Sequence, residues 1–270
     1  MTTPTTSPIL VTGGTGTLGR LVVARLVEAG HAVRVLSRRP ATAGDDRPGV
    51  ELVAGDLAAD QGIDAAVANV GVILHLAGTS KGDGDKARSL VQAARRAGSP
   101  HLVHISVVGA DRVPVTSAVD RAMFGYFASK LDAEREVAGS GLPWTTLRAT
   151  QFHELVLRVA EGLARLPVVP VPSGFRFQPI AAAEVADRLV DLALGAPAGL
   201  VPDVAGPEVR RLDDLVRAYL RSRGKRRPFV PMPVFGGAAR AVRDGAILAP
   251  DRAVGRQTWD EFLAPVPATV

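Results

Sequence analysis

The stretch that decides the fold class reads Ile9-Leu-Val-Thr-Gly-Gly-Thr-Gly-Thr-Leu-Gly19. A short apolar run is followed at once by glycines and then by the amphipathic stretch Leu18–Ala29. Glycines recur at every third position, at Gly13, Gly16 and Gly19. Between a strand and a helix, such glycines allow a tight bend, close approach of the backbone to a pyrophosphate, and close packing of helix on strand. The free N–H groups and dipole of the helix N-terminus favour phosphates, so the stretch predicts a dinucleotide-binding turn.

Short apolar runs and helix-length stretches alternate from this turn up to about residue 150. The apolar runs are rich in Val, Ile and Leu with little polar alternation, which is typical of strands covered on both faces. Gly30 and Gly98 end two of the helical stretches, as C-cap glycines do. The alternation predicts a doubly wound parallel sheet of the α/β class. The expected strands are Ile9–Thr12, Ala32–Leu36, Glu51–Val53, Val72–Leu76, Leu102–Ile105 and Thr145–Leu147, and the expected helices are Leu18–Ala29, Ile63–Asn69, Lys86–Ala97 and Arg121–Ala138.

After residue 150 the pattern loosens, because prolines interrupt the chain. A core over residues 1–152 is expected to bind the cofactor, and residues of about 180–205 are expected to rejoin it. Residues 153–179 and 206–270 are interpreted as a small C-terminal lobe that binds the substrate. In this part the sequence predicts a short strand at Phe175–Gln178, an extended return to the sheet at Leu200–Val204, and helices at Ala182–Leu194, Leu212–Ser222 and Phe235–Asp244.

Composition excludes several classes of protein. The 270 residues are 47% hydrophobic and 22% charged, which is ordinary for a globular chain. The absence of Cys excludes disulfides, thiolate metal sites and Cys nucleophiles. No apolar run approaches the ~20 residues of a membrane span, and the first residues lack the pattern of a signal peptide. We therefore expect a cytoplasmic protein without a membrane partner, and the preference for Arg over Lys suggests a GC-rich bacterial source.

The formal net charge of +5 comes from an excess of basic residues near the C-terminus. The densest group is Arg221-Ser-Arg-Gly-Lys-Arg-Arg227, and only Phe229 follows it closely. Nucleic-acid binding would require a broader patch with interleaved aromatic residues, so no nucleic-acid partner is expected. The group is interpreted as a solvated helix end, with an anionic ligand or a protein partner as alternatives.

The end of the second expected strand indicates which dinucleotide binds. It reads Val35-Leu-Ser-Arg-Arg39, and no acidic residue occurs between Gly30 and Gly44. An NAD enzyme normally places a carboxylate here, on the ribose 2′-hydroxyl. A Ser hydroxyl and a guanidinium would instead attract a 2′-phosphate, so NADP(H) is the predicted cofactor; the alternative is a solvated loop that accepts either cofactor. The full set of predicted cofactor-binding residues is Gly13, Thr15, Gly16, Thr17, Leu18, Gly19, Ser37, Arg38, Arg39, Asp56, Leu57, Ala77, Gly78, Thr79 and Lys130.

One Tyr and one Lys stand at helical spacing in a chain that has only two Tyr and four Lys residues. Tyr126 and Lys130 are four residues apart, so on a helix they share one face. The ammonium would lower the pKa of the phenol below its usual ~10. Such a phenol can donate a proton to a carbonyl oxygen while hydride reaches the carbon. The alternative for this pair is a half-buried Tyr beside a snorkelling Lys. Ser106, at the end of the fifth expected strand, is the candidate that polarises the carbonyl, and the alternative for Ser106 is a turn hydroxyl.

Three residues after the sixth expected strand are candidates for substrate binding: Gln151, Phe152 and His153. His153 suits proton transfer or substrate binding, and the alternative is simply the polar start of a helix. The substrate cleft is expected to be lined by Phe152, His153, Phe175, Phe177 and residues near Met232–Phe235. This apolar lining indicates an apolar or aromatic substrate. No metal is expected, because His101 and His104 would point to opposite faces of a strand.

Taken together, these motifs resemble the short-chain dehydrogenase/reductase superfamily, and within it the atypical, NmrA-like NAD(P)H-binding branch. The resemblance runs through nearly the whole chain. It is carried by Thr12–Gly19, Gly55–Leu57, Leu102–Gly109, Tyr126–Lys130, Leu142–Phe152, Phe177–Ile180, Glu184–Asp187 and Ala205–Pro207.

The resemblance implies a Rossmann-type core with a small C-terminal substrate lobe. It also implies NADP(H)-dependent reduction of a carbonyl, or oxidation of the alcohol, in a small organic molecule, with Tyr126 as acid and Lys130 as its helper. Many relatives have a second Ser or Thr after the fifth strand, where this chain has Val107 and Val108. Two alternatives stay open: a non-catalytic NADP(H)-sensing regulator, and an epimerase or dehydratase that recycles its cofactor. A monomer or homodimer is expected.

Overall fold

The computed structural model describes residues 7–39, 47–79 and 81–264. Residues 1–6, on which the expectation about a signal peptide partly rests, lie outside the described part, as do residues 40–44 of the stretch without acidic residues. The chain divides into two compact units by its internal contacts. Unit 1 comprises residues 1–106, 125–148 and 183–202, and unit 2 comprises residues 107–124, 149–182 and 203–270.

Unit 1 is built on a seven-stranded sheet in the order β3-β2-β1-β4-β5-β6-β9. The first six strands in this order match the doubly wound nucleotide-binding fold, and the α/β fold class predicted from the sequence is confirmed. Neighbouring strands run parallel, with Thr12 of β1 opposite both Leu36 of β2 and His75 of β4. The strands are β1 (Ile9–Thr12), β2 (Val33–Ser37), β3 (Val50–Ala54), β4 (Val72–His75), β5 (His101–Val107), β6 (Trp144–Ala149) and β9 (Gly199–Leu200).

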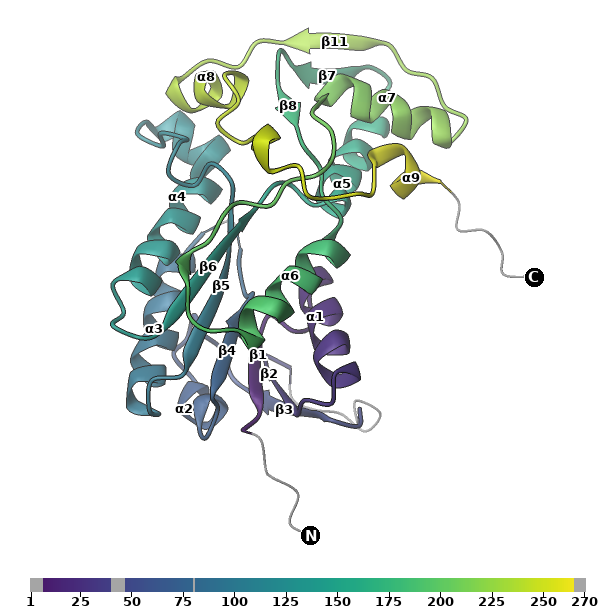
Figure 1. The fold of residues 1–270 in the computed structure, drawn as a ribbon. Coiled ribbons are helices and arrows are strands. Elements are labelled where there is room, and N and C mark those ends of the chain that lie inside the picture. The colour runs from purple at the N-terminus through teal and green to yellow at the C-terminus, as the bar shows by residue number, and fades with distance from the viewer. Residues whose placement is uncertain (1–6, 40–46, 80, 265–270) are drawn as a thin grey trace, which may run out of the picture. The chain divides into compact units, whose positions relative to one another are not determined.

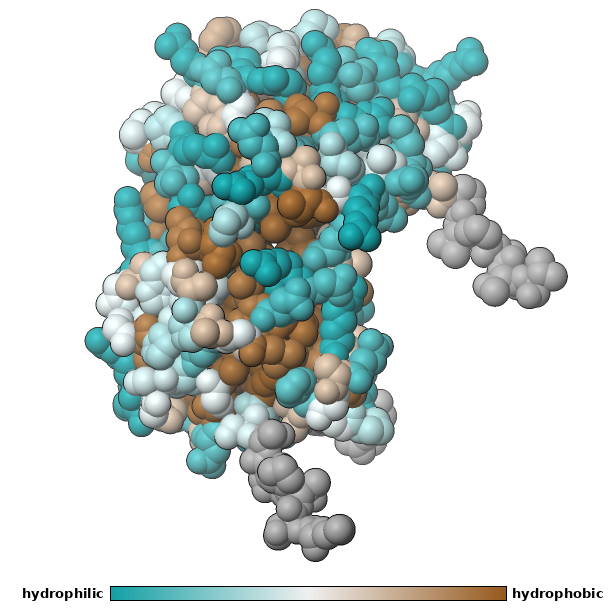
Figure 2. All heavy atoms as spheres, in the orientation of Figure 1, coloured by the Kyte–Doolittle hydropathy of each residue, from teal (hydrophilic) through white to brown (hydrophobic). Residues whose placement is uncertain are grey.

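Helices cover both faces of this sheet (Figure 1). On one face α2 (Ile63–Val67), α3 (Asp83–Arg96) and α4 (Ala118–Ala138) enclose a core that includes Leu10 and Leu102 from the strands. The other face carries α1 (Thr17–Glu28) and α6 (Ala182–Leu194), which an ion pair between Arg25 and Asp187 joins. Figure 2 shows apolar side chains gathered along the sheet between the two helical layers, while hydrophilic side chains cover the helices.

Two glycines end their helices as predicted. Gly30 follows α1 with a φ of 84°, and Gly98 follows α3 with a φ of 104°. The next residue in each case donates its N–H to a carbonyl of the last helical turn, from His31 to Leu26 and from Ser99 to Ala94. This is the bonding of a left-handed helix cap, which a Cβ would strain. Both helices are therefore terminated by local sequence before the chain enters the next strand.

A buried ion pair ties α4 to β6 within unit 1. Arg148 donates from Nε to Oε1 of Glu134 at 2.8 Å and from Nη2 to Oε2 at 2.6 Å. Both side chains are 10% exposed. The two parallel hydrogen bonds hold the guanidinium in one plane with the carboxylate.

We expect Glu134→Ala to lower the free energy of unfolding by about 3–5 kcal/mol, because it leaves a buried guanidinium without its carboxylate. Urea denaturation monitored by circular dichroism measures the change. The matched control is Glu136→Ala on the same helix. The Glu136 carboxylate pairs with the half-exposed Arg88. That change is expected to cost less than about 1 kcal/mol. Equal costs for the two variants would contradict the assigned role of the buried pair.

Unit 2 is smaller in regular structure and contains two short sheets. One pairs β7 (Val169–Pro172) with β11 (Phe229–Met232) in parallel, and the other pairs β8 (Arg176–Phe177) with β10 (Arg210–Arg211) in antiparallel fashion. Its core includes Trp259, whose indole N–H donates to the Leu215 carbonyl at 3.0 Å. Its helices include α5 (His153–Ala164), α7 (Leu212–Ser222), α8 (Gly237–Arg243) and α9 (Trp259–Leu263), with a 3-10 turn at Pro250–Arg252.

The structure departs from the sequence predictions in several places. The third helix, expected from Lys86, begins at Asp83, and the fourth, expected from Arg121, begins at Ala118. The strands β7 and β11 were not expected, because their prolines suggested irregular chain. Among the described residues, no helix combines the length and apolar character that a membrane span needs.

Candidate cofactor-binding and catalytic site

A pocket of about 290 Å³ opens in unit 1 where β1 and β4 lie side by side. This is the position at which the strand order reverses, where open α/β sheets bind their ligands. Most of the predicted cofactor-binding residues line it, whereas Thr17, Leu18, Gly19, Arg39 and Lys130 are not among its lining residues. The lining consists of Thr12, Gly13, Thr15, Gly16, Leu36, Ser37, Arg38, Gly55, Asp56, Leu57, Ala58, Leu76, Ala77, Gly78, Thr79 and Lys86.

The glycine turn is packed so tightly that two of its positions exclude a side chain. A Cβ on Gly13, whose φ is 71°, would lie 2.7 Å from the Ala77 nitrogen. A Cβ on Gly19 would overlap the Gly13 carbonyl oxygen and lie 2.6 Å from Gly14 Cα. Gly13 therefore brings the turn against the end of β4, and Gly19 brings α1 against the turn. Both are the close approaches predicted from the spacing.

The first turn of α1 is chemically suited to phosphate. Its N-cap residue, Gly16, offers no side chain to the free backbone N–H groups, and the turn contains no acidic residue. Unoccupied N–H groups and the positive end of the helix dipole attract anions. The residues present thus fit the pyrophosphate of a dinucleotide: a bare glycine turn and an uncapped helix meet at one end of the pocket.

At the far side of the pocket lie the residues predicted to bind the adenosine half. Ser37 and Arg38 line it from the end of β2, and the Arg39 backbone N–H donates to Ser37 Oγ at 3.2 Å. Asp56 lines it from the end of β3, and its Oδ1 accepts the Ala58 N–H at 2.8 Å. Asp56 therefore closes its own turn in addition to facing the pocket.

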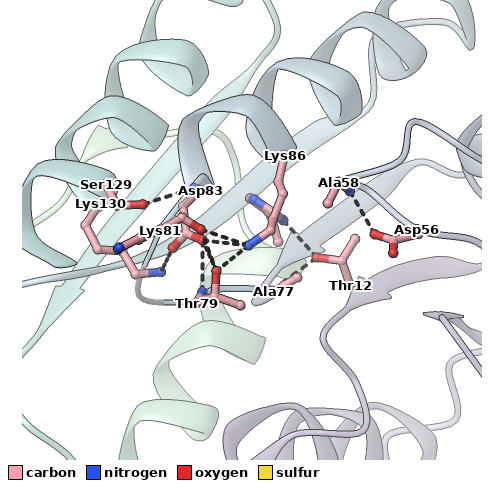
Figure 3. A network of polar contacts seen from close by, with 11 residues as sticks. Thr12, Asp56, Ala58, Ala77, Thr79, Lys81, Asp83, Lys86, Ser129 and Lys130 are labelled. Atoms are coloured by element: carbon pink, nitrogen blue, oxygen red, sulfur yellow. Dashed lines mark hydrogen bonds and ion pairs between the residues drawn. The ribbon is translucent and has the colours of Figure 1, made fainter. Parts of the chain in front are cut away.

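A network of charged side chains borders the pocket at the end of β4 (Figure 3). Its centre is Asp83, which is 1% exposed. Asp83 Oδ1 accepts the Thr79 N–H at 2.9 Å and an Nζ hydrogen of Lys86 at 3.1 Å, while Oδ2 lies 3.1 Å from Lys130 Nζ. Lys86 also donates to Thr79 Oγ1. Sequence reasoning missed Asp83 and Lys86; the signal available was an acidic residue followed by a Lys three positions later in Asp83-Gly-Asp-Lys86.

Tyr126 and Lys130 lie together on α4, as their spacing predicted. Lys130 Nζ is 5.7 Å from the centre of the Tyr126 ring. The expected lowering of the phenol pKa is wrong, however: desolvation first, and then the Asp83 charge, raise the pKa of Tyr126 to about 12. The Lys130 ammonium is already paired with Asp83, so it does not stabilise the phenolate. The phenol therefore stays protonated at neutral pH.

Ser106 lies in a buried polar row on the α3–α4 face of the sheet. His75 and His104 stack there with ring centroids 5.2 Å apart, and His75 Nδ1 is 2.8 Å from Thr12 Oγ1. Burial, with a contribution from Lys130, lowers the pKa of His75 to about 3, so the ring is neutral. Ser106 is two residues beyond His104 on β5 and so faces the same way. Its hydroxyl is buried and makes no hydrogen bond within the described residues, and its catalytic role stays a prediction.

The three candidate substrate residues belong to unit 2 and have structural partners there. Gln151 Nε2 donates to the Ile247 carbonyl at 3.1 Å, and Gln151 Oε1 accepts the Gln178 N–H at 3.2 Å. Phe152 is the N-cap residue of α5. The buried His153 ring stacks on Phe262 at 4.9 Å and has Nε2 3.0 Å from the Gln257 carbonyl oxygen. These contacts favour the packing interpretation of Gln151 and His153, and their role in substrate binding stays a prediction.

The fold and the pocket define a dinucleotide-binding protein of the Rossmann type. The family model for NAD(P)H-binding proteins matches residues 13–194. The chain therefore belongs to the NAD(P)H-binding family, in agreement with the resemblance that its motifs carry.

Several curated relatives with related sequences carry reductase names. The chain is 32% identical over 161 residues to a (4-alkanoyl-5-oxo-2,5-dihydrofuran-3-yl)methyl phosphate reductase of Streptomyces griseus. The aligned residues cover 60% of this chain and 54% of the relative. It is 29% identical over 167 residues to an NAD(P)H azoreductase of Xenophilus azovorans, and these residues cover 62% of this chain and 56% of the relative. The match thus spans little more than half the length of these relatives.

A solved structure shares the fold over nearly the whole chain. It is an NADPH-dependent quinone oxidoreductase from Escherichia coli, crystallised in complex with NADPH. The two chains superpose with a TM-score of 0.77 and 18% identity, over 94% of this chain and 98% of the other. At this identity the likeness establishes the fold alone.

Proposed function

We propose that the protein is an NADP(H)-dependent oxidoreductase that reduces the carbonyl, or oxidises the corresponding alcohol, of a small apolar or aromatic molecule. One observation carries the proposal: Tyr126 and Lys130 lie one helical turn apart, and Lys130 lies against Gly78, a residue of the dinucleotide pocket. The reductase names of the relatives support the reaction class.

When bound, the cofactor supplies the hydride. The chain supplies the proton and the geometry. The Tyr126 phenol donates its proton to the carbonyl oxygen as that oxygen gains negative charge, and Ser106 is proposed to polarise the same oxygen. Lys130 is proposed to hold the ribose next to the nicotinamide through its ammonium N–H groups. In the reduction direction the phenol must start protonated, which its raised pKa favours.

The test is a fall in NADPH absorbance on mixing the purified protein with quinones, ketones, aldehydes and azo compounds. Turnover of at least one compound is the expected result. NADPH binding without turnover of any compound would favour a cofactor-sensing regulator, and product formation without net cofactor change would favour an epimerase or dehydratase. No heat on calorimetric titration with either NADPH or NADH would overturn the proposal altogether.

We propose NADP(H) over NAD(H) on the basis of Ser37 and Arg38, which line the pocket from the end of β2, and because the sequence has no acidic residue between Gly30 and Gly44. Arg38→Ala is expected to weaken NADPH binding by roughly 10- to 100-fold, because a charged hydrogen bond to phosphate contributes about 1.5–3 kcal/mol. NADH affinity should change less than about twofold. Calorimetry with both nucleotides measures the difference.

The control for this experiment is Arg135→Ala, which removes the same charge from an exposed position on α4. It tests whether net charge alone explains the loss. Equal weakening of NADPH and NADH by Arg38→Ala would rule out contact with a 2′-phosphate.

A further inference from the structure

Asp83 connects the pocket to the helix that carries the catalytic pair. It is the first residue of α3, and its side chain bonds backward to Thr79 in the loop that lines the pocket. Its own N–H donates to Ser129 Oγ on α4 at 3.0 Å, and its Oδ2 faces Lys130 on the same helix. Figure 3 shows these contacts converging on Asp83. Asp83 thus touches the pocket loop and α4 at once.

Lys130 has little freedom in this arrangement. The residue is 5% exposed, and its Nζ lies 3.1 Å from Asp83 Oδ2. A Cβ on Gly78 would collide with Lys130 Nζ and lie 3.1 Å from Asp83 Oδ2. The backbone of the pocket therefore approaches the ion pair as closely as a glycine permits. The ammonium is therefore confined between Asp83 and the pocket-lining loop that contains Gly78.

The titratable groups around the Asp83–Lys130 ion pair come from four elements. Lys86 and Asp83 lie on α3, Lys130 and Tyr126 on α4, His75 on β4 and His104 on β5. Burial lowers the pKa of both histidines, so neither carries charge near neutral pH. Burial would also raise the pKa of Asp83, but Lys130, the Thr79 N–H and Lys86 outweigh it and hold that pKa below its usual value. Asp83 is therefore the only negative charge among these groups.

We propose that Asp83 is a positioning residue for the Tyr126–Lys130 pair: its carboxylate holds the Lys130 ammonium at the pocket backbone and offsets that positive charge at the phenol, so that Tyr126 keeps its proton. The inference rests on the proposed function, because it assigns the phenol the role of acid. Without Asp83 the unpaired ammonium would favour the phenolate, which has no proton to give.

The test titrates the phenol directly. Only two Tyr residues occur in the chain, so Tyr219→Phe leaves Tyr126 as the sole phenol. In this background, ultraviolet absorbance of the phenolate is followed against pH, and circular dichroism at each pH restricts the fit to folded protein. Asp83→Asn is expected to shift the midpoint to lower pH by roughly one unit or more. The matched control is Asp85→Asn, an exposed carboxylate in the same helical turn, which should leave the midpoint unchanged.

A second variant gives a shift of opposite sign and guards against misfolding of the first. Lys130→Met removes the ammonium that faces the phenol, while Asp83 keeps its charge and its contact with Lys86. The phenolate should therefore form at higher pH than in the Tyr219→Phe parent. An unchanged or rising midpoint in folded Asp83→Asn, or a falling one in Lys130→Met, would overturn the proposal. Neither measurement needs substrate or cofactor, so a failure of the proposed reaction is distinguishable from a failure of this inference.

Activity provides a further readout where a substrate is found. In the reduction direction, the alkaline limb of the kcat profile reports loss of the Tyr126 proton. Asp83→Asn should move that limb to lower pH, whereas a loss of folded protein alone would scale the rate at every pH. An alkaline limb at the parent position would contradict the assigned role.

Discussion

Tyr126→Phe is expected to lower kcat for carbonyl reduction by about 10²- to 10⁴-fold, the usual contribution of a positioned general acid. The change removes one oxygen from a residue that is 37% exposed, so the fold should persist. The aromatic ring stays beside Lys130, and no predicted nucleotide contact is lost. The Kd for NADPH should therefore remain within about twofold of the parent value. Steady-state kinetics and calorimetry on the same preparation measure the two quantities.

The matched control is Tyr219→Phe on α7, the other Tyr of the chain. It makes the same chemical change in unit 2, on a residue outside the pocket lining, and should leave kcat close to the parent value. If Tyr126→Phe retained the parent rate, the proton donor would have to be sought elsewhere. Ser106 would be the first candidate, because its hydroxyl is buried at the end of β5.

Gly19→Ala is expected to lower both the free energy of unfolding and the affinity for the cofactor. The added Cβ would overlap the Gly13 carbonyl oxygen and lie 2.8 Å from the Gly13 carbonyl carbon. Both are backbone atoms, so relief requires α1 to move away from the turn. We expect a loss of about 3 kcal/mol or more in the free energy of unfolding, at or above the usual range for overpacking. The same displacement should weaken NADPH binding by at least about tenfold, since it moves the helix N-terminus away from the turn.

Gly162→Ala provides the comparison for this variant. Gly162 lies within α5, and a Cβ there would meet nothing within 4 Å. Replacing Gly by Ala in a helix should raise stability by about 0.5–1 kcal/mol without steric cost. Urea denaturation and NADPH titration of both variants complete the test. A Gly19→Ala protein with parent stability and affinity would refute the close-packing role assigned to this glycine.

The elements of unit 1 could be predicted because local signals agree with the fold. The apolar runs of β1 to β6 are each bounded by glycine or polar residues, and the helices between them are long enough to show periodicity. Gly30 and Gly98 add stop signals that the structure confirms with positive φ angles. The pocket could be predicted from the glycine turn, because the positive φ of Gly13 and the close backbone contacts at Gly13 and Gly19 permit few residues other than glycine.

The charged network beside the pocket could not be predicted in the same way. Asp83 stands between Gly82 and Gly84, two residues of low helix propensity, and the helix was expected only from Lys86. The helix forms anyway, because α3 buries Leu90 and Val91 in the core of unit 1. The Tyr126 pKa is raised first by desolvation and then by the Asp83 charge, and the spacing of Tyr126 and Lys130 shows neither of them. A spacing of four residues shows that two groups meet, but it does not show which third group has already paired with one of them.

Unit 2 was harder to predict for a different reason. The strands β7 and β11 contain prolines, which normally interrupt a ladder, and their partners lie far apart in sequence. His153 was placed at a helix start, and the structure confirms that α5 begins there. Its stacking with Trp259 and Phe262 joins segments separated by about 100 residues. Such long-range partners leave no periodic signal in the sequence around His153.

The interleaving of the two units constrains how the chain can be made and cut. Unit 1 receives its last segment, residues 183–202, only after residues 149–182 of unit 2 have been added. That segment supplies β9, which pairs with β6, and α6, whose Asp187 pairs with Arg25 of α1. During synthesis the nucleotide-binding sheet therefore stays incomplete until three quarters of the chain have left the ribosome. A fragment ending at residue 152 would lack α6 and β9 of unit 1. Because each unit is built from three separate segments, a single cleavage cannot separate the units.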